Sequence, residues 1–354
     1  MSRERLTWSL CDSATMSSID IFRHGRGRTI TEDLNRPGSA SLRIPLDDPL
    51  GTQVEPIRTC IKVARGSNIV WSGPVWTIVD QTDENMGWTT IGAVGWQEIL
   101  HHRVLNPPDQ KIQLTDTSDG MINALLAAAN AKGPTLTGAA SSTFITIGSL
   151  GSNNVQLTRT FDFFTNIGDA IFQLTQLENG VDVWVDPGTR KLNVTALRGT
   201  VKDGAALRLK GARSNVTSAI RNVDASRLAN RFWVVGASSA TGYADDSGSQ
   251  GTYGLFEDQQ SLSDVSDSTI LGAYANAELV TKGRPIVTYE LAPSSYVDGV
   301  VPMVYEDFTL GDFFTFSIEQ GRIDVTSQIA RCFGFTLADQ DDGNEKITSL
   351  KLLA

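Results

Sequence analysis

Cysteine and long apolar runs are both scarce in this 354-residue chain. The three cysteines, Cys11, Cys60 and Cys332, are odd in number and far apart, so they form neither a disulfide framework nor a zinc-binding pattern. We expect them to be buried as small apolar side chains in a protein that folds in a reducing cytoplasm. The longest apolar runs, such as residues 122–129, are far shorter than the ~18–20 residues that cross a bilayer. This pattern excludes a helical membrane protein.

Basic charge is also in the minority. The 30 Lys and Arg residues against 40 Asp and Glu residues give a net charge of −10. Proteins that bind duplex DNA usually carry a basic face, so we expect no sequence-specific nucleic-acid binding. Acidic charge does not exclude DNA that passes nearby without binding. Apolar residues make up 40% of the chain, which excludes intrinsic disorder. The length predicts two to three domains of roughly 150 residues.

Motifs of catalytic and nucleotide-binding centres are missing. The chain contains no G-x-S-x-G, no H-E-x-x-H, no P-loop and no G-x-G-x-x-G that opens a helix. Its carboxylate pairs lie in turn-like stretches, which favours local capping of backbone amides over acid–base catalysis. We therefore predict no catalytic, cofactor-binding or metal-binding residues, no cofactor and no enzymatic activity. The carboxylate pairs are Asp47–Asp48, Asp245–Asp246 and Asp341–Asp342.

Histidine is too rare to suggest a metal site. His101 and His102 are adjacent, so in an extended chain their side chains point to opposite faces and chelate a metal poorly. Residues 24–28, which include His24, have the composition of a phosphate-binding loop. They lie between two short predicted strands rather than before a helix, which favours a solvated hairpin tip.

Short segments of alternating hydrophobicity make up the first hundred residues. In residues 57–64, for example, Ile61 and Val63 alternate with Lys62 and Ala64. Strands at such regular spacing predict an antiparallel barrel or sandwich. The predicted strands are residues 18–22, 28–32, 40–44, 57–64, 69–71, 75–79 and 88–96, with turn clusters that include residues 47–49, 65–68 and 83–85.

Helical spacing of apolar residues follows. Residues 121–129 predict a helix that Ser118 caps and Gly133 stops. A second helix is expected from Asn166, which can cap it, to Gly180. Strands at 181–185 and 191–196 follow as a hairpin, so this region predicts an α+β unit.

The last third returns to β character. Residues 236–254 are dense in Gly, Ser, Ala and Asp, which predicts a long mobile loop. Residues 268–281 predict a third helix. The strands predicted in this part of the chain are residues 231–235, 286–291, 313–318, 331–337 and 346–353.

Six segments resemble those of a known protein family, in the same order along the chain. They are N-R-P-G-S-A-S-L-R-I-P-L-D-D-P at residues 35–49, V-W-S-G-P-V at 70–75, G-W-Q-E-I-L at 95–100, A-N-R-F-W-V-V-G at 229–236, F-T-L-G-D-F-F-T-F at 308–316 and I-A-R-C-F-G-F at 329–335. The chain thereby resembles the tail-hub proteins of tailed bacteriophages, which are also called minor tail or tail-associated proteins.

The resemblance implies a mainly β fold with α+β parts. It consists of two antiparallel β-barrel-like hub domains, an α/β domain and a small helix-containing insertion. Residues 1–100 would form the first barrel and 101–215 the α+β domain. Residues 216–236 and 285–354 would form a split second barrel, around an insertion at 237–284.

The resemblance also implies a structural role at the tail tip of a siphophage-like virion, after assembly in the cytoplasm of the bacterial host. Family hubs form homotrimers, so two barrels per subunit give six barrel positions that match a sixfold tail tube. Such a ring joins the tail tube or distal tail protein to a fibre or spike, contacts the tape-measure protein and closes the lumen until DNA ejection.

Two alternative functions stay open at this point. A carbohydrate-binding tail module would present exposed tryptophans in a groove, and Trp71, Trp76, Trp88 and Trp96 cluster in the first β region. Tryptophan at strand positions more often fills a core. A component of a cell-wall hydrolase would need a cleft with paired carboxylates or a metal.

A hub lumen that DNA traverses should carry few basic side chains, because arginine pairs with phosphates. The negative net charge favours an acidic or neutral lining. Asp116, Asp119 and Asp162 are the candidate residues for this lining.

Overall fold

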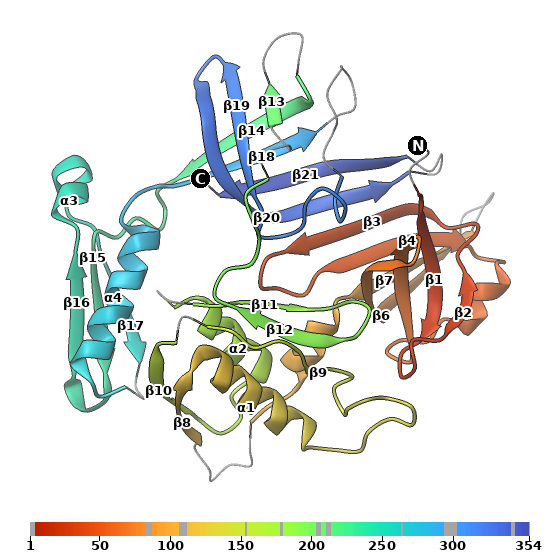
Figure 1. The fold of residues 1–354 in the computed structure, drawn as a ribbon, viewed down its shortest axis with the longest axis horizontal. Helices are drawn as coiled ribbons and strands as arrows, with labels where there is room; N and C mark the ends of the chain where they lie inside the picture. The colour runs from red at the N-terminus through yellow and green to blue at the C-terminus, as the bar shows by residue number, and fades with distance from the viewer. Residues whose placement is uncertain are drawn as a thin grey trace.

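The computed structural model describes residues 4–82, 87–105, 112–152, 154–177, 180–202, 207–209, 214–262, 265–293, 303–340 and 344–353. Strands outnumber helices among these residues, so the fold is mainly β with α+β parts, as predicted (Figure 1). No helix in the described ranges is long and apolar enough to span a bilayer. The predicted turn at 83–85 and the Asp341–Asp342 pair lie outside the described residues.

Seven strands form the first β region, in the sheet order β3-β4-β7-β6-β5-β1-β2. β1 was not among the predicted strands, and its side chains of Trp8 and Leu10 are buried in the core. The strands are β1 (Leu6–Asp12), β2 (Ser18–Ile21), β3 (Arg26–Asp33), β4 (Ser39–Pro45), β5 (Thr59–Arg65), β6 (Asn68–Thr82) and β7 (Gly87–Val94).

Three predicted strand boundaries in this region are wrong. The predicted strands 69–71 and 75–79 are one strand, β6, which continues through Gly73 without a break. Gly73 allows close contact, since a Cβ atom there would lie 1.9 Å from the carbonyl oxygen of Val94. The predicted strand 57–64 begins only at Thr59, since Ile57 has a φ of 66°. Strand 88–96 ends before Trp96, which begins the 3₁₀ helix η2 (Trp96–His102).

The second β region shares its sheet and its core with the first. β20 pairs antiparallel with β3, so the described strands of both regions form one 13-stranded sheet. Phe314 and Phe335 of the second region and Ile30 of the first belong to one apolar cluster. The strands of the second region are β13 (Leu207–Leu209), β14 (Val216–Asp224), β18 (Ile286–Pro293), β19 (Phe313–Gln320), β20 (Ile323–Asp339) and β21 (Glu345–Leu353).

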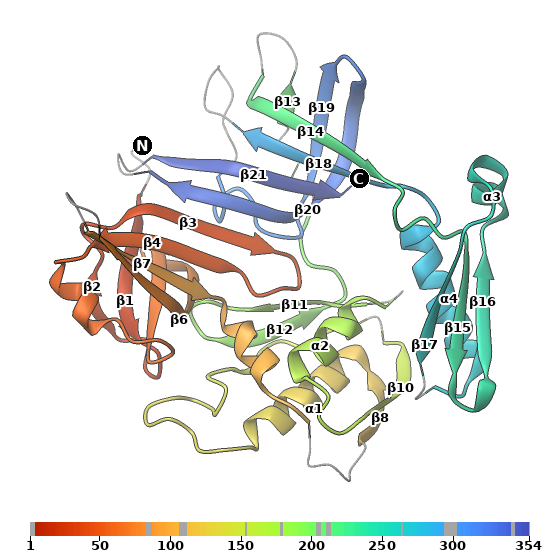
Figure 2. The same ribbon diagram turned by 180° about the vertical axis from the view of Figure 1, so that it is seen from behind.

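The α/β part lies below this sheet in Figures 1 and 2 and has its own core. Asn166 caps α2 as predicted and accepts a hydrogen bond from the Asp169 amide. The N-cap position of α1 is Thr117, not Ser118, and its side chain makes no capping hydrogen bond. Helix α2 ends well before Gly180. The elements are η2, β8 (Ile112–Thr117), α1 (Ser118–Asn130), β9 (Thr146–Ile147), β10 (Gln156–Phe161), α2 (Ile167–Thr175), β11 (Asp182–Val185) and β12 (Lys191–Thr195).

The insertion is a three-stranded sheet covered by α4, and it extends to one side of the molecule (Figure 2). The third predicted helix corresponds to α4. The elements are β15 (Arg231–Gly236), η4 (Ala237–Ser239), β16 (Thr241–Asp245), α3 (Ser247–Tyr253), β17 (Glu257–Leu262) and α4 (Ser268–Lys282).

The prediction that residues 236–254 form a mobile loop is wrong. They form η4, β16 and α3, and their small residues allow close packing. A Cβ atom on Gly242 would lie 2.4 Å from the amide nitrogen of Gly272 in α4. A second correction concerns residues 231–236, which we expected in the second barrel. They form β15, which pairs with β16 and β17 inside the insertion.

Candidate functional site

Most of the segments that carry the family resemblance meet at one place. The first β region, the α/β part and the second β region come together there, with the hairpin of β11 and β12 between them (Figure 1). We call this place the junction. It consists of Asn35, Ser72, Trp96, Asp182, Arg198, Asp312 and Arg331.

The carboxylate of Asp182 is the centre of the junction and is 5% exposed. Its Oδ1 accepts a hydrogen bond from Asn35 Nδ2 at 3.1 Å, and Asn35 Oδ1 accepts one from the Val183 amide at 2.8 Å. Its Oδ2 accepts from the Arg198 amide at 2.6 Å and pairs with Arg331. One carboxylate therefore binds the first β region, the linker after β12 and the second β region.

Asp312 holds that linker from the other side. Its Oδ1 accepts from the Thr200 amide at 2.7 Å, and its Oδ2 accepts from the Thr309 amide at 2.8 Å. The preceding Gly311 has a φ of 89°, and a Cβ atom there would lie 2.5 Å from the Arg198 carbonyl oxygen. The L-G-D segment thus requires glycine both for its backbone conformation and for its contact with the linker.

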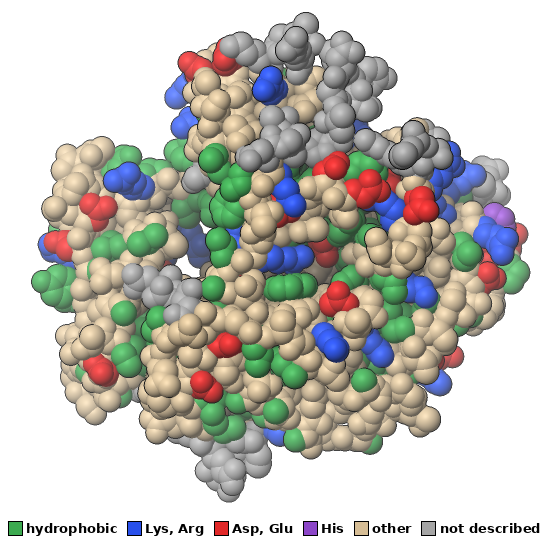
Figure 3. Space-filling model, viewed as in Figure 1, with side chains coloured by type: hydrophobic (Ala, Val, Ile, Leu, Met, Phe, Trp, Pro, Cys, Tyr) green, Lys and Arg blue, Asp and Glu red, His purple; other side chains and the backbone are tan. Residues whose placement is uncertain are grey.

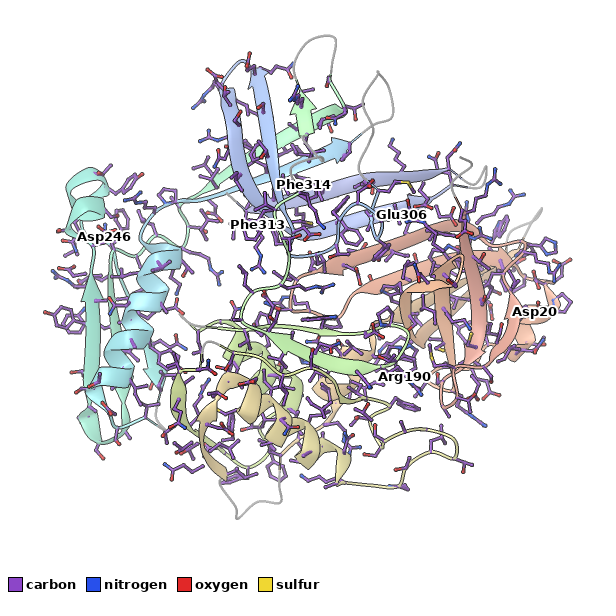
Figure 4. All side chains as sticks on the ribbon, viewed as in Figure 1. Asp20, Arg190, Asp246, Glu306, Phe313 and Phe314 are labelled. Atoms are coloured by element: carbon purple, nitrogen blue, oxygen red, sulfur yellow. The ribbon has the colours of Figure 1, made fainter. Side chains whose placement is uncertain are left out.

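A second set of contacts ties the α/β part to the first β region. Trp96 Nε1 donates to Ser72 Oγ at 2.8 Å, and Ser72 Oγ donates to the Pro187 carbonyl oxygen at 2.6 Å. Arg190, labelled in Figure 4, donates to the carbonyl oxygens of Ser13 and Ala14 after β1. The W-S-G-P-V and G-W-Q segments are therefore contact residues between two parts of the chain.

A cleft of about 630 Å³ opens at the junction. Glu32, Trp184, Arg198 and Tyr305 are among its lining residues, and the Arg198 guanidinium lies over the Trp184 ring at 4.8 Å. The Tyr305 hydroxyl donates to Glu32 Oε2 at 3.1 Å. Loss of water around the Glu32 carboxyl raises its pKa to about 7, although the charge of Arg198 and the Tyr305 hydrogen bond act in the opposite direction.

The structure does not bring the histidines together. His24 lies in the turn between β2 and β3, as predicted, and contacts Asp48 at 3.1 Å. His101 contacts Asp169 at 3.1 Å, whereas His102 lies beside Glu98. Within the described ranges, no group of three or more His, Cys, Asp or Glu residues could hold a metal ion.

The cysteines are buried, as we predicted, and one residue of each described carboxylate pair caps a helix through a backbone amide. Cys11, Cys60 and Cys332 are free and buried. Asp48 caps η1 through the Leu50 amide. Asp246 caps α3 through the Ser249 amide, and Asp245 pairs with Arg231 at 3.2 Å.

The four tryptophans of the first β region do not form an exposed sugar-binding groove. Trp71 and Trp96 line the cleft but are only 2% and 1% exposed. Trp76 and Trp88 are half-buried, and the Arg43 guanidinium lies over the Trp88 ring at 5.1 Å. This arrangement counts against a carbohydrate-binding function for these residues.

The candidate lining residues all lie in or beside the α/β part. Asp116 in β8 and Asp162 after β10 are exposed, whereas Asp119 in α1 is half-buried. On the face in Figure 3, acidic and basic side chains are interspersed, so this face carries no broad basic patch.

Sequence reasoning missed Asp182, Arg198 and Glu32. The one available signal was a charge in an otherwise apolar strand, V-D-V-W-V, at Asp182. A charge at such a position needs a buried partner, but the partner itself could not be found from the sequence.

No protein-family model matches the chain, and no curated protein matches its sequence. Its fold, however, is shared with solved structures of phage tail proteins. The tail protein from Neisseria meningitidis MC58 superposes with a TM-score of 0.69 at 13% identity, over 99% of this chain and 97% of that one. The prophage MuSo2 43 kDa tail protein from Shewanella oneidensis gives 0.67 at 13% identity, over 98% and 97%.

A more distant structure has the same architecture. The E. coli c3393 protein is a component of the type VI secretion system and has structural similarity to the T4 bacteriophage tail proteins gp27 and gp5. It superposes with a TM-score of 0.51 at 9% identity, over 93% of this chain and 73% of that one. The resemblance to phage tail proteins is thus confirmed for the fold.

Replacing Asp182 with Asn should destabilise the protein. The asparagine amide has the shape of the carboxylate but lacks the charge that pairs with Arg331. Its NH₂ group would also face groups that are themselves hydrogen-bond donors. We expect a loss of roughly 1.5–3 kcal/mol in the free energy of unfolding, the range for hydrogen bonds to charged groups. Urea denaturation measures it, with Asp20→Asn on the exposed β2 as the control. Equal stability of the two variants would contradict this role of Asp182.

Replacing Glu32 with Gln should change how stability depends on pH. A folded-state pKa of about 7, above the ordinary value of 4.5, means that the folded protein binds this proton more tightly. The stability that this proton contributes at low pH is therefore lost as the pH rises between those two values. Gln cannot ionise, so Glu32→Gln should gain stability relative to wild type between about pH 5 and about pH 8.

Urea denaturation at both pH values measures this difference, with the exposed Glu55→Gln as the matched control. A stability difference between Glu32→Gln and wild type that stays the same at both pH values would show that Glu32 has an ordinary pKa.

Proposed function

We propose that this chain is the structural hub at the tail tip of a siphophage-like virion. Three copies would form a ring that joins the tail tube or distal tail protein to a fibre or spike. The ring would contact the tape-measure protein and close the lumen until DNA ejection. Assembly would take place in the cytoplasm of the bacterial host.

The observation that carries this proposal is the shared sheet of the two β regions. Apart from the parallel pair β13–β19, the strands of both regions pair antiparallel, and the β3–β20 pairing joins the two regions around one apolar core. A subunit that contributes two rigidly joined β units allows a threefold ring to present six positions to a sixfold tube. The fold likeness to phage tail proteins over nearly the whole chain supports the same proposal.

The proposed domains are a first barrel at residues 1–100, an α+β domain at 101–215, a split second barrel and an insertion. The pairing of β15 inside the insertion favours a boundary after Asp224 rather than after residue 236. We further propose that an acidic or neutral lumen lining includes Asp116, Asp119 and Asp162. The exposure of Asp116 and Asp162 supports this assignment.

Mass measurement of the purified chain tests the hub. Three copies of 38.3 kDa give 114.9 kDa, and negative-stain imaging should show a threefold ring. A closed ring requires heterologous contacts between its subunits. The proposal allows this ring to form either alone or together with the neighbouring tail ring. A monomer at micromolar concentrations, together with intact virions that contain no such ring, would contradict the proposal.

A further inference from the structure

Arg159 occupies a position where the strand pattern demands an apolar side chain. In β10, it lies between Leu157 and Phe161 on one face of the strand, and its cross-strand partner in β8 is Leu114. These three neighbours pack against the core of the α/β part. Arg159 is only 7% exposed, so a cation is buried in the middle of an apolar face.

The partners of Arg159 do not neutralise its charge. Nη2 donates to Gln173 Oε1 at 3.4 Å, and the guanidinium lies 5.8 Å from the ring centres of Phe161 and Tyr274. Nε and Nη1 have no hydrogen-bond acceptor, and no carboxylate of the described ranges forms an ion pair with the guanidinium. A buried charge without a counter-charge is costly, so an unpaired arginine here requires an explanation.

Arg159 is one of the residues that line a cleft of about 430 Å³ between the α/β part and the insertion. Lining residues from β10 and α2 form one wall, and residues from β17 and α4 form the other. Figures 1 and 2 show these four elements from opposite sides. This volume lies within the range of small-molecule sites, about 300–1,000 Å³. The uncharged polar side chains of the lining include Thr160, Gln173, Gln176, Gln260 and Ser261.

Two carboxylates also line the cleft, but neither forms an ion pair with Arg159. Glu278 pairs with Lys282 at 2.9 Å, and Asp162 is exposed to water. Nε and Nη1 are fully buried, so Nη2, whose hydrogen bond to Gln173 is long, is the nitrogen that would contact an anion in the cleft.

We propose that this cleft binds a small ligand that carries a carboxylate or phosphate group beside uncharged polar groups. Arg159 supplies the charge-assisted hydrogen bonds to the anionic group. The glutamine amides and Ser261 contact the uncharged part of the ligand. Because the two walls belong to different parts of the chain, the ligand also stabilises the position of the insertion against the α/β part.

Thermal unfolding with defined probes tests the site. The probes are inorganic phosphate, glucuronate as a carboxylated sugar, and glucose as its uncharged control, all at equal ionic strength. A ligand that binds only the folded state, at about ten times its Kd, should raise the Tm by about 2–4 °C. If phosphate raises the Tm, an anionic group alone is sufficient for binding. If only glucuronate raises it, the ligand needs a carboxylate attached to a polar ring.

Two variants assign the effect to Arg159. Arg159→Gln and Arg159→Met should both lose the Tm increase, whereas Arg23→Gln, on an exposed side chain, should keep it. Arg159→Met should also be at least as stable as wild type without a probe, because it removes an unpaired buried charge. The proposal is overturned if neither anion stabilises wild type more than it stabilises the Arg159 variants. It is also overturned if glucose stabilises as strongly as glucuronate.

Discussion

The buried carboxylate of Asp182 accepts hydrogen bonds from parts of the chain that are far apart in sequence. Asn35, the Arg198 amide and Arg331 each supply a donor, and they belong to the β3–β4 loop, the linker after β12 and strand β20. Because a buried polar group without a partner is costly, none of these parts can move away alone without leaving a charge or a donor unsatisfied. The junction therefore couples the position of the α/β part to both β regions.

The two β regions are also joined by the β3–β20 strand pairing and by a shared apolar core. The strand pairing makes the two β regions one sheet around one core, in which Phe335 packs beside Phe308. In the ring that we propose, such a joined unit would hold the two β regions of each subunit in fixed positions. The exception is the insertion, which has a separate small core and is joined to the second β region after β14 and before β18.

The sequence predicted those elements whose position depends on local signals, such as helix caps and turns. It did not predict those whose position depends on close packing against distant segments. Helix α2 followed from its Asn166 cap and its apolar spacing, and the tight hairpin of β11 and β12 from its turn. Gly73 falls between two predicted strands and Gly242 falls in a predicted loop, yet each lies in a strand against the backbone of a distant segment. Such contacts join residues far apart in the chain, so composition cannot reveal them. The same limit hid the junction, since a charge in a strand shows that a partner is needed but not which one.

Hydrogen exchange of the native protein tests the central claim, that the junction opens only when the whole body unfolds. The informative amides are those of Val183, Arg198 and Thr200, which donate to side chains across the junction. The account predicts that all three exchange with the free energy of global unfolding, as the amides of β20 do. Exchange of these three amides at a much lower free energy, with β20 still protected, would show that the parts separate independently and would contradict the account.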